Sequence, residues 1–103
     1  MKIRQIHVAG AARTPMGGLQ GALAGLAAPE LGGAAIRAAL ARAGADAGRI
    51  DALFMGCVLP AGMGQAPARQ AGFAGGLPQS VPATTLNKMC GSGMQAVMMA
   101  GDA

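Results

Sequence analysis

Apolar and polar side chains alternate at the start of the chain, which is typical of a β-strand. Within residues 3–10, Ile6 and Val8 occupy alternate positions and a glycine ends the run. We expect this segment to open a sheet. Residues 11–28 contain an Arg-Thr-Pro sequence and several glycines, so they are expected to form a loop with at most a weak helical turn at its leucines.

Residues 29–43 carry helix signals at both ends. Pro29 suits the first position of a helix, and Glu30 suits the positive end of the helix dipole. Gly44 suits the left-handed residue that commonly ends a helix. Because apolar side chains between these ends recur one turn apart, the segment predicts a helix with one apolar face.

The second half of the chain continues the alternation of strands and helices. Residues 51–59 form a nearly continuous apolar run, which is typical of a strand covered on both faces. Residues 67–73 begin with a proline and predict a short helix, and residues 82–89 have a Thr-Thr-Leu centre that favours a strand. Residues 94–100 are almost wholly apolar and predict a helix that must be buried. The order β-α-β-α-β-α predicts an α/β fold with a mainly parallel sheet and right-handed crossovers.

The composition limits how large the hydrophobic core can be. The 103 residues suffice for one domain at most, and 52% of them are hydrophobic while 12% are charged, which indicates a globular chain. However, alanine supplies much of the hydrophobic fraction, 18 residues are glycine, and 2 phenylalanines are the aromatic side chains. We therefore expect a thin core in which close backbone packing replaces large side chains.

The positive charge of the chain does not indicate a nucleic-acid partner. The formal net charge is +4, but the basic residues are spread along the chain, and it has no tryptophan or tyrosine to stack on bases. No stretch has the ~20 apolar residues that a membrane helix needs, and the first residues are too polar for a secretory signal. We expect a cytoplasmic protein with neither a nucleic-acid nor a membrane partner.

Two cysteines and one histidine are the remaining candidates for chemistry. Cys57, Cys90 and His7 lie far apart in the sequence and match no metal-ligand spacing, so neither a metal site nor a disulfide is expected. Cys57 lies within an apolar run and is interpreted as a packing residue. His7 falls on the first expected strand, where nothing directs it toward Cys90.

Cys90 lies between an expected strand and the first turn of an expected helix. Unpaired backbone N–H groups and the helix dipole favour a thiolate at such a position. The same donors, from the backbone of Cys90, Gly91 and Gly93, can bind the carbonyl oxygen of an acyl group on the sulfur, while the glycines leave room for a thioester. The pattern is that of a strand-nucleophile-helix turn. A small, unreactive cysteine in a glycine-rich turn is the alternative that the spacing leaves open.

Four segments of the chain resemble the thiolase family, in the family's order. They read Arg-Thr-Pro-Met-Gly at 13–17, Ala-Pro-Glu-Leu-Gly at 28–32, Met-Gly-Cys-Val-Leu at 55–59 leading into Gly-Gln-Ala-Pro-Ala-Arg-Gln at 64–70, and Val-Pro-Ala at 81–83 leading into Asn-Lys-Met-Cys-Gly-Ser-Gly-Met-Gln-Ala-Val at 87–97. The last segment is highly specific. The resemblance covers almost the whole chain and is to the opening of the N-terminal domain of the acetyl-CoA acetyltransferases, the acetoacetyl-CoA thiolases.

This resemblance implies an acyltransferase with Cys90 as its nucleophile. The cysteine would take the acyl group of an acyl-CoA, and a second substrate would resolve the acyl-enzyme in a ping-pong cycle. The reaction is then either the Claisen condensation of two acetyl-CoA molecules or the thiolytic cleavage of a 3-ketoacyl-CoA in fatty acid metabolism. The sequence Lys-Met-Cys-Gly at 88–91 is more similar to that of short-chain thiolases than to that of long-chain degradative thiolases. CoA thioesters are substrates in this family, no bound cofactor is implied, and a homo-oligomer, either a dimer or a tetramer, is expected.

The sequence departs from the family's pattern in two respects. Ala66 occupies a position where the family often has asparagine, in a loop at the dimer contact of relatives, so one local hydrogen bond is in question. The family's later histidines, its second catalytic cysteine and its CoA-binding loop have no counterpart among residues 1–103. We therefore expect these residues to be an incomplete thiolase N-terminal domain.

An incomplete domain has consequences for its last helix. Met94, Val97 and Met98 are expected to lie exposed because their partners would belong to the rest of the domain, and instability or aggregation is expected. Two other functions are compatible with such a chain. One is a catalytically inactive segment that dimerises with a longer relative through this apolar surface, and the other is a small independent domain with inert cysteines.

Overall fold

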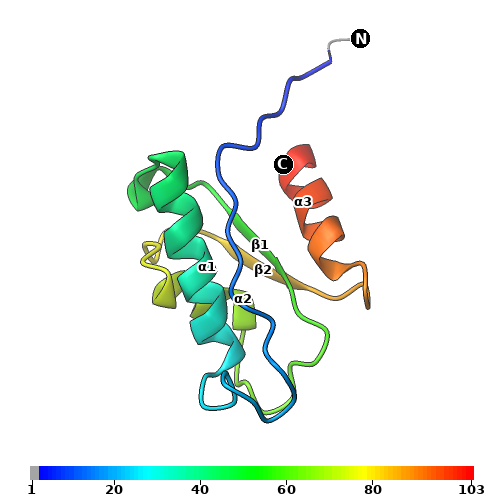
Figure 1. The fold of residues 1–103 in the computed structure, drawn as a ribbon. Helices are drawn as coiled ribbons and strands as arrows, with labels where there is room; N and C mark the ends of the chain where they lie inside the picture. The colour runs from blue at the N-terminus through cyan, green and yellow to red at the C-terminus, as the bar shows by residue number, and fades with distance from the viewer. Residues whose placement is uncertain (1–2) are drawn as a thin grey trace.

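The computed structural model describes residues 3–103 as a small parallel sheet with helices on both sides. Figure 1 shows helices α1 and α2 on one side of strands β1 and β2, and helix α3 on the other. Helix α2 packs against both strands, α1 packs against α2, and α3 packs against β1. The elements in chain order are α1 (Ala28–Ala43), a 3-10 turn η1 (Ala47–Arg49), β1 (Leu53–Gly56), α2 (Pro67–Ala74), β2 (Ala83–Leu86) and α3 (Ser92–Asp102).

The two strands pair in the parallel sense, as predicted. Leu53 lies opposite Ala83, and the register continues to Gly56 opposite Leu86. The Cys57 amide then donates to the Leu86 carbonyl across 2.9 Å, so the pairing reaches the ends of both strands. Parallel strands need a crossover connection, which α2 supplies here. The α/β class and two of the three expected strands are therefore confirmed.

The strand expected at residues 3–10 is not formed, and this prediction was wrong. The segment is irregular, and the Val8 side chain is 83% exposed. It passes between α1 and α3 (Figure 1) and is held by arginine side chains, with Arg4 donating to the Gly101 and Ala103 carbonyls at 2.9 and 3.1 Å. Alternating side chains favour a strand only where a neighbouring backbone offers hydrogen bonds, and no such backbone lies beside this segment within residues 3–103.

Helix α1 begins and ends where its sequence signals predict. The Glu30 carboxylate accepts a hydrogen bond from the Ala27 amide at 2.6 Å, which satisfies one of the donors left free at the helix start. At the other end, Gly44 has φ 63° and its amide bonds the Ala41 carbonyl. The predicted helix over residues 29–43 is thus confirmed to within one residue.

Small residues bring α1 and α2 close together. A Cβ atom on Gly33 would lie 2.6 Å from the Ala74 Cβ, and one on Gly75 would lie 2.7 Å from a methyl group of Ile36. The Arg37 side chain, which also crosses this contact, donates to the Ala74 carbonyl. In the described residues no large side chain is fully buried, and the buried apolar residues are Ala68, Ala71, Leu77, Val81 and Ala96. The prediction of a thin, closely packed core is confirmed.

Helix α3 buries one face only. Ala96 is buried, whereas Met94 is 68% exposed and Val97 and Met98 are also exposed. The prediction that this helix is buried on all sides was therefore wrong for the structure described, because its main packing partner is β1, on one side. The exposure expected for these three side chains in an incomplete domain is confirmed. Within residues 3–103, no helix combines the length and the apolar character needed to cross a membrane.

Candidate functional site: the turn that carries Cys90

Cys90 lies where the sequence placed it, in the turn after β2 and two residues before the start of α3. Its side chain is exposed and its thiol is free. The turn that carries it occupies residues 87–92 and joins the carboxyl end of a parallel strand to the amino end of a helix. In open α/β folds, ligands bind beyond the carboxyl ends of the strands, so this is the edge of the sheet at which a reactive group is useful.

The residue before Cys90 has an unusual backbone conformation. Met89 has φ 47°, in the left-handed region that side chains other than glycine and asparagine rarely adopt. The Asn87 side chain supports this conformation, because its Oδ1 accepts a hydrogen bond from the Met89 amide at 2.9 Å. Asn87 also donates through Nδ2 to the Val58 carbonyl at 3.4 Å, which links the turn to the segment after β1.

The buried side chain of Ser92 bonds to the backbone of the same turn. Its side chain is the one buried polar group of the described residues, with 5% of its surface exposed. Its Oγ donates to the Met89 carbonyl at 2.6 Å and accepts from the Lys88 amide at 2.9 Å. Sequence reasoning gave this residue no role. The available signal was a serine at the start of a helix directly after glycine, where hydroxyls commonly bond to nearby backbone groups.

The backbone donors near Cys90 are not equivalent. The Gly91 amide, one of the expected oxyanion donors, donates instead to the Lys88 carbonyl at 3.0 Å and so helps to form the turn. No side chain caps the start of α3, and within the described part of the chain the amides of Gly93 and Met94 have no hydrogen-bond acceptor. Two donors at the positive end of the helix dipole therefore remain free beside the cysteine.

The end of β1 touches the start of α3. A Cβ atom placed on Gly56 would lie 2.6 Å from the Ser92 Cβ and 2.8 Å from its carbonyl carbon, distances that real atoms do not adopt. Glycine is therefore required at this position for Ser92 to sit against the sheet. Since Ser92 also holds the turn, the strand end, the helix start and the turn form one packed unit around the cysteine.

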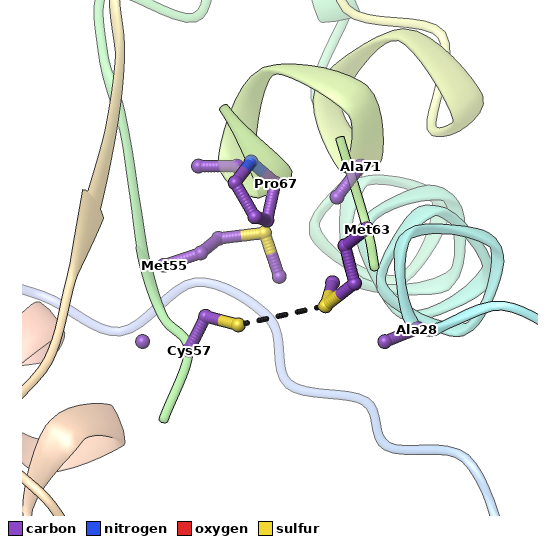
Figure 2. A pocket seen from close by; sticks show the side chains of 8 residues that line it. Ala28, Met55, Cys57, Met63, Pro67 and Ala71 are labelled. Atoms are coloured by element: carbon purple, nitrogen blue, oxygen red, sulfur yellow. Dashed lines mark hydrogen bonds between the residues drawn. The ribbon is translucent and has the colours of Figure 1, made fainter. Parts of the chain in front are cut away.

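The second cysteine is in a different environment. Cys57 follows β1 and is half-buried, and its Sγ lies 3.9 Å from the Met63 Sδ. Figure 2 shows both sulfur atoms at a small apolar cavity of about 60 Å³, bounded by Met55 and by the start of α2. No charged side chain lines this cavity. These surroundings agree with the interpretation of Cys57 as a packing residue.

His7, the histidine of the chain, does not join the turn. It lies exposed in the irregular N-terminal segment, and no hydrogen bond links it to Cys90. Residues 3–103 also contain no group of three or more His, Cys, Asp or Glu side chains that could hold a metal ion. The structure thus brings together Cys90, Gly91 and Gly93, which are close in sequence, and adds Asn87 and Ser92 to them.

Ala66, which stands where the thiolase family often has asparagine, lies in the loop before α2. This residue is the N-cap of α2 and has φ 48°, yet it has no side-chain group that can accept a hydrogen bond. Thr85 of β2 partly compensates, because its Oγ1 accepts from the Ala68 amide at 2.9 Å. The Gln70 side chain holds the preceding loop by donating to the Met63 and Gln65 carbonyls at 2.7 and 2.6 Å.

Comparison with known proteins identifies the family. The family model described as "Thiolase, N-terminal domain" matches residues 6–103. The chain is 50% identical over 101 residues to an acetyl-CoA acetyltransferase of Pseudomonas aeruginosa, covering 98% of this chain and 26% of that protein. It is 53% identical over 98 residues to an acetyl-CoA acetyltransferase of Cupriavidus necator, covering 95% of this chain and 25% of that protein.

The structural comparison gives the same result. The structure of an acetyl-CoA acetyltransferase from Syntrophomonas wolfei matches with a TM-score of 0.86 and 41% identity, over 92% of this chain and 24% of that one. The chain therefore spans about a quarter of the length of the curated relatives it matches. The four segments that resemble thiolases, the parallel fold and the family model agree, and the chain belongs to the thiolase family.

Proposed function

We propose that this chain carries the acyl-accepting nucleophile of an acetyl-CoA acetyltransferase and that Cys90 is that nucleophile. One observation supports the proposal above all others: Cys90 has an exposed thiol at the uncapped start of α3, next to backbone donors that no protein group uses. Relatives about 50% identical are described as acetyl-CoA acetyltransferases. Cys57, which is half-buried among thioethers, is the less suitable thiol.

The proposed reaction is a thioester exchange. The Cys90 sulfur attacks the carbonyl carbon of acetyl-CoA, a new S–C bond forms, and the S–C bond to CoA breaks. CoA leaves as a thiol and carries the proton that Cys90 gives up. During the attack, negative charge develops on the carbonyl oxygen, and the free Gly93 amide together with the backbone of Cys90 is suited to stabilise it. Gly91 contributes the turn and the space beside the sulfur.

The acyl group is then passed to a second substrate in the proposed cycle. Condensation with a second acetyl-CoA or cleavage of a 3-ketoacyl-CoA by CoA both return a free Cys90 thiol, so CoA thioesters serve as substrates throughout. We propose that residues 1–103 supply the nucleophile as part of a larger thiolase domain. The short fraction of each relative that the chain covers supports this. The relatives' names also support the short-chain, acetoacetyl-CoA type.

Incubation with acetyl-CoA tests the proposal directly. We expect the chain to release CoA and to carry an acetyl group on the Cys90 peptide but not on the Cys57 peptide, as measured by mass spectrometry. A Cys90→Ser chain is the matched control, since it keeps the size of the side chain and removes the thiol. Equal acetylation of both cysteines, or of neither, contradicts the proposal.

The apolar surface of α3 favours a second candidate function. The exposed Met94, Val97 and Met98 side chains belong to one helix and would suit a segment that binds a second thiolase chain without catalysis. Sedimentation of the chain alone and mixed with a longer relative separates the two functions. Association combined with no acetyl transfer would favour the interaction segment.

Two further expectations stay proposals. A homo-oligomeric assembly is supported by the same exposed apolar side chains, and sedimentation of the purified protein measures it. A cytoplasmic location is compatible with bacterial relatives, although one relative 51% identical, from Xenopus laevis, is named as mitochondrial. Localisation of a tagged chain in its host tests this expectation.

A further inference from the structure

We propose that Ser92 is a positioning residue for Cys90, and that its buried hydroxyl holds the left-handed turn that presents the thiol. This inference rests on the proposed function of Cys90 as nucleophile. Ser92 itself makes no hydrogen bond to the Cys90 side chain. It acts on the backbone just before Cys90, through its hydrogen bonds to the Lys88 amide and the Met89 carbonyl.

The hydrogen bonds of Ser92 fix the direction of its hydroxyl. A serine hydroxyl has one proton to donate, and here the proton goes to the Met89 carbonyl at 2.6 Å. The oxygen accepts the Lys88 amide at 2.9 Å. Because the side chain is 5% exposed, water has little access to replace either bond. Removing the hydroxyl therefore leaves the Lys88 amide without its partner inside the turn.

These bonds are needed because the turn is strained. Met89 has φ 47°, which a methionine adopts only where its surroundings impose it. The Ser92 hydroxyl bonds the backbone on both sides of the strained unit, at the Lys88 amide and the Met89 carbonyl. The Asn87 side chain supports the same residue from outside, through the Met89 amide.

Ser92 also connects the turn to the sheet. Gly56, at the end of β1, leaves no room for even one additional carbon against the Ser92 side chain. Ser92 is thus held against the end of β1, and its hydroxyl ties the backbone of the turn to that strand. The geometry assigns Ser92 the task of holding Cys90 at the start of α3, where the Gly93 amide is free.

The test compares Ser92→Ala with Met89→Gly alone and with the two changes combined, which separates the turn from general stability. Ser92→Ala removes the hydroxyl and adds no atom to the packed contact with Gly56. Met89→Gly accepts the left-handed conformation without support from Ser92. The two readouts are the rate of acetyl transfer from acetyl-CoA to Cys90 and the rate of iodoacetamide alkylation at Cys90 relative to Cys57. The second readout depends on the thiol alone and requires no acyl-CoA.

We expect Ser92→Ala to slow acetyl transfer to Cys90 about tenfold, because the Lys88 amide loses its partner within the turn and the backbone donors lose their alignment. Alkylation at Cys90 relative to Cys57 should fall about threefold, since it depends less on that alignment. Met89→Gly alone should stay within about twofold of the unaltered chain in both rates, because glycine adopts this φ without strain and Ser92 keeps both hydroxyl bonds. Adding Met89→Gly to Ser92→Ala should restore most of the loss, because glycine needs no help to adopt this φ.

The outcomes distinguish this inference from the proposed function. If Ser92→Ala leaves the acetyl-transfer and alkylation rates at Cys90 unchanged, the positioning role is overturned. This holds also if the unaltered chain transfers no acetyl group and only the alkylation rate can be compared. A loss that Met89→Gly does not restore, accompanied by faster alkylation of Cys57, also overturns it, because that pattern indicates general unfolding. If the unaltered chain accepts no acetyl group but its alkylation ratio follows the expected pattern, the positioning role stands and the proposed function fails.

Discussion

The two cysteines of this chain follow neighbouring parallel strands, yet their surroundings differ in almost every respect. Cys57 comes directly after β1 and lies half-buried with its sulfur 3.9 Å from the thioether of Met63. Cys90 follows β2 after a strained turn and lies exposed at the start of a helix. The Cys57 cavity offers only apolar groups and thioethers, whereas the Cys90 turn offers free amides.

This difference shows that the segment after the strand decides what a thiol can do. After β1 the chain enters a glycine-containing loop that returns to α2 and covers the sulfur. After β2 it turns within six residues into α3, and the turn leaves the helix start uncapped. Chemistry at a cysteine needs access and a positive local field, and only the second segment supplies both.

The difference between the two cysteines should have its largest effect on acetyl transfer when each thiol is exchanged for a hydroxyl. Cys90→Ser should abolish acetyl transfer from acetyl-CoA, because serine without an adjacent base is a very weak nucleophile. Cys57→Ser should leave the rate of transfer to Cys90 within about twofold of the unaltered chain, since the two sulfur atoms have separate surroundings. Mass spectrometry of the two cysteine peptides measures both variants. Acetyl transfer that depends on Cys57 contradicts the assignment.

Because Gly56 of β1 packs against Ser92 of α3, a substitution on the strand should displace the turn that carries Cys90. Gly56→Ala should lower the free energy of unfolding by about 2 kcal/mol, because the new methyl group has no space against Ser92. It should also slow acetyl transfer to Cys90. Denaturant unfolding and the transfer assay measure the two effects. Gly18→Ala is the control, since nothing lies within 4 Å of a Cβ atom at Gly18. Equal behaviour of the two variants would show that the contact does not support the turn.

Truncation of Met63 should act on Cys57 alone. Met63→Ala removes the thioether beside the Cys57 sulfur and enlarges the cavity, so we expect a loss of about 1 kcal/mol for this half-buried side chain and faster alkylation of Cys57. Alkylation of Cys90 should not change. Timed labelling with iodoacetamide and peptide mapping measures both rates. A parallel change at Cys90 would mean that the two sites are coupled.

The smallest expected effect is a gain in stability at Ala66. Asparagine adopts left-handed backbone angles more readily than alanine, and its side chain can cap the start of α2. Ala66→Asn should therefore raise the free energy of unfolding by about 1 kcal/mol. Thermal unfolding measures the gain, and Ala66→Gly separates the backbone effect from the cap. No gain with asparagine would show that Thr85 already supplies the cap fully.

The sequence predicts most of the local structure of this chain. Helix α1 carries its start and stop signals within its own residues, and α2 begins at the proline that marks it. The position of Cys90 between a strand and a helix also followed from the local pattern. The strand expected at residues 3–10 failed because a strand depends on a partner elsewhere in the chain, and the alternation of Ile6 and Val8 contains no information about that partner.

The candidate site was predicted in part. The sequence placed Cys90, Gly91 and Gly93 together because they are neighbours, and the resemblance to thiolases gave the cysteine its expected role. It did not show that the Gly91 amide is used within the turn, that Met89 is left-handed, or that Ser92 is buried. These features depend on how α3 meets β1 at Gly56, which is a tertiary contact that no local pattern encodes.

The rate of alkylation of each cysteine, measured in the folded and in the unfolded chain, tests whether the turn activates Cys90. With iodoacetamide, and with a short cysteine peptide as the reference for the effect of urea, we expect folding to accelerate the reaction of Cys90 and to slow that of Cys57. Opposite directions within one molecule would show that the turn activates one thiol while the cavity protects the other. If folding slows the alkylation of Cys90 or leaves its rate unchanged, the turn confers no special reactivity on this thiol, and the proposed role of the turn is contradicted.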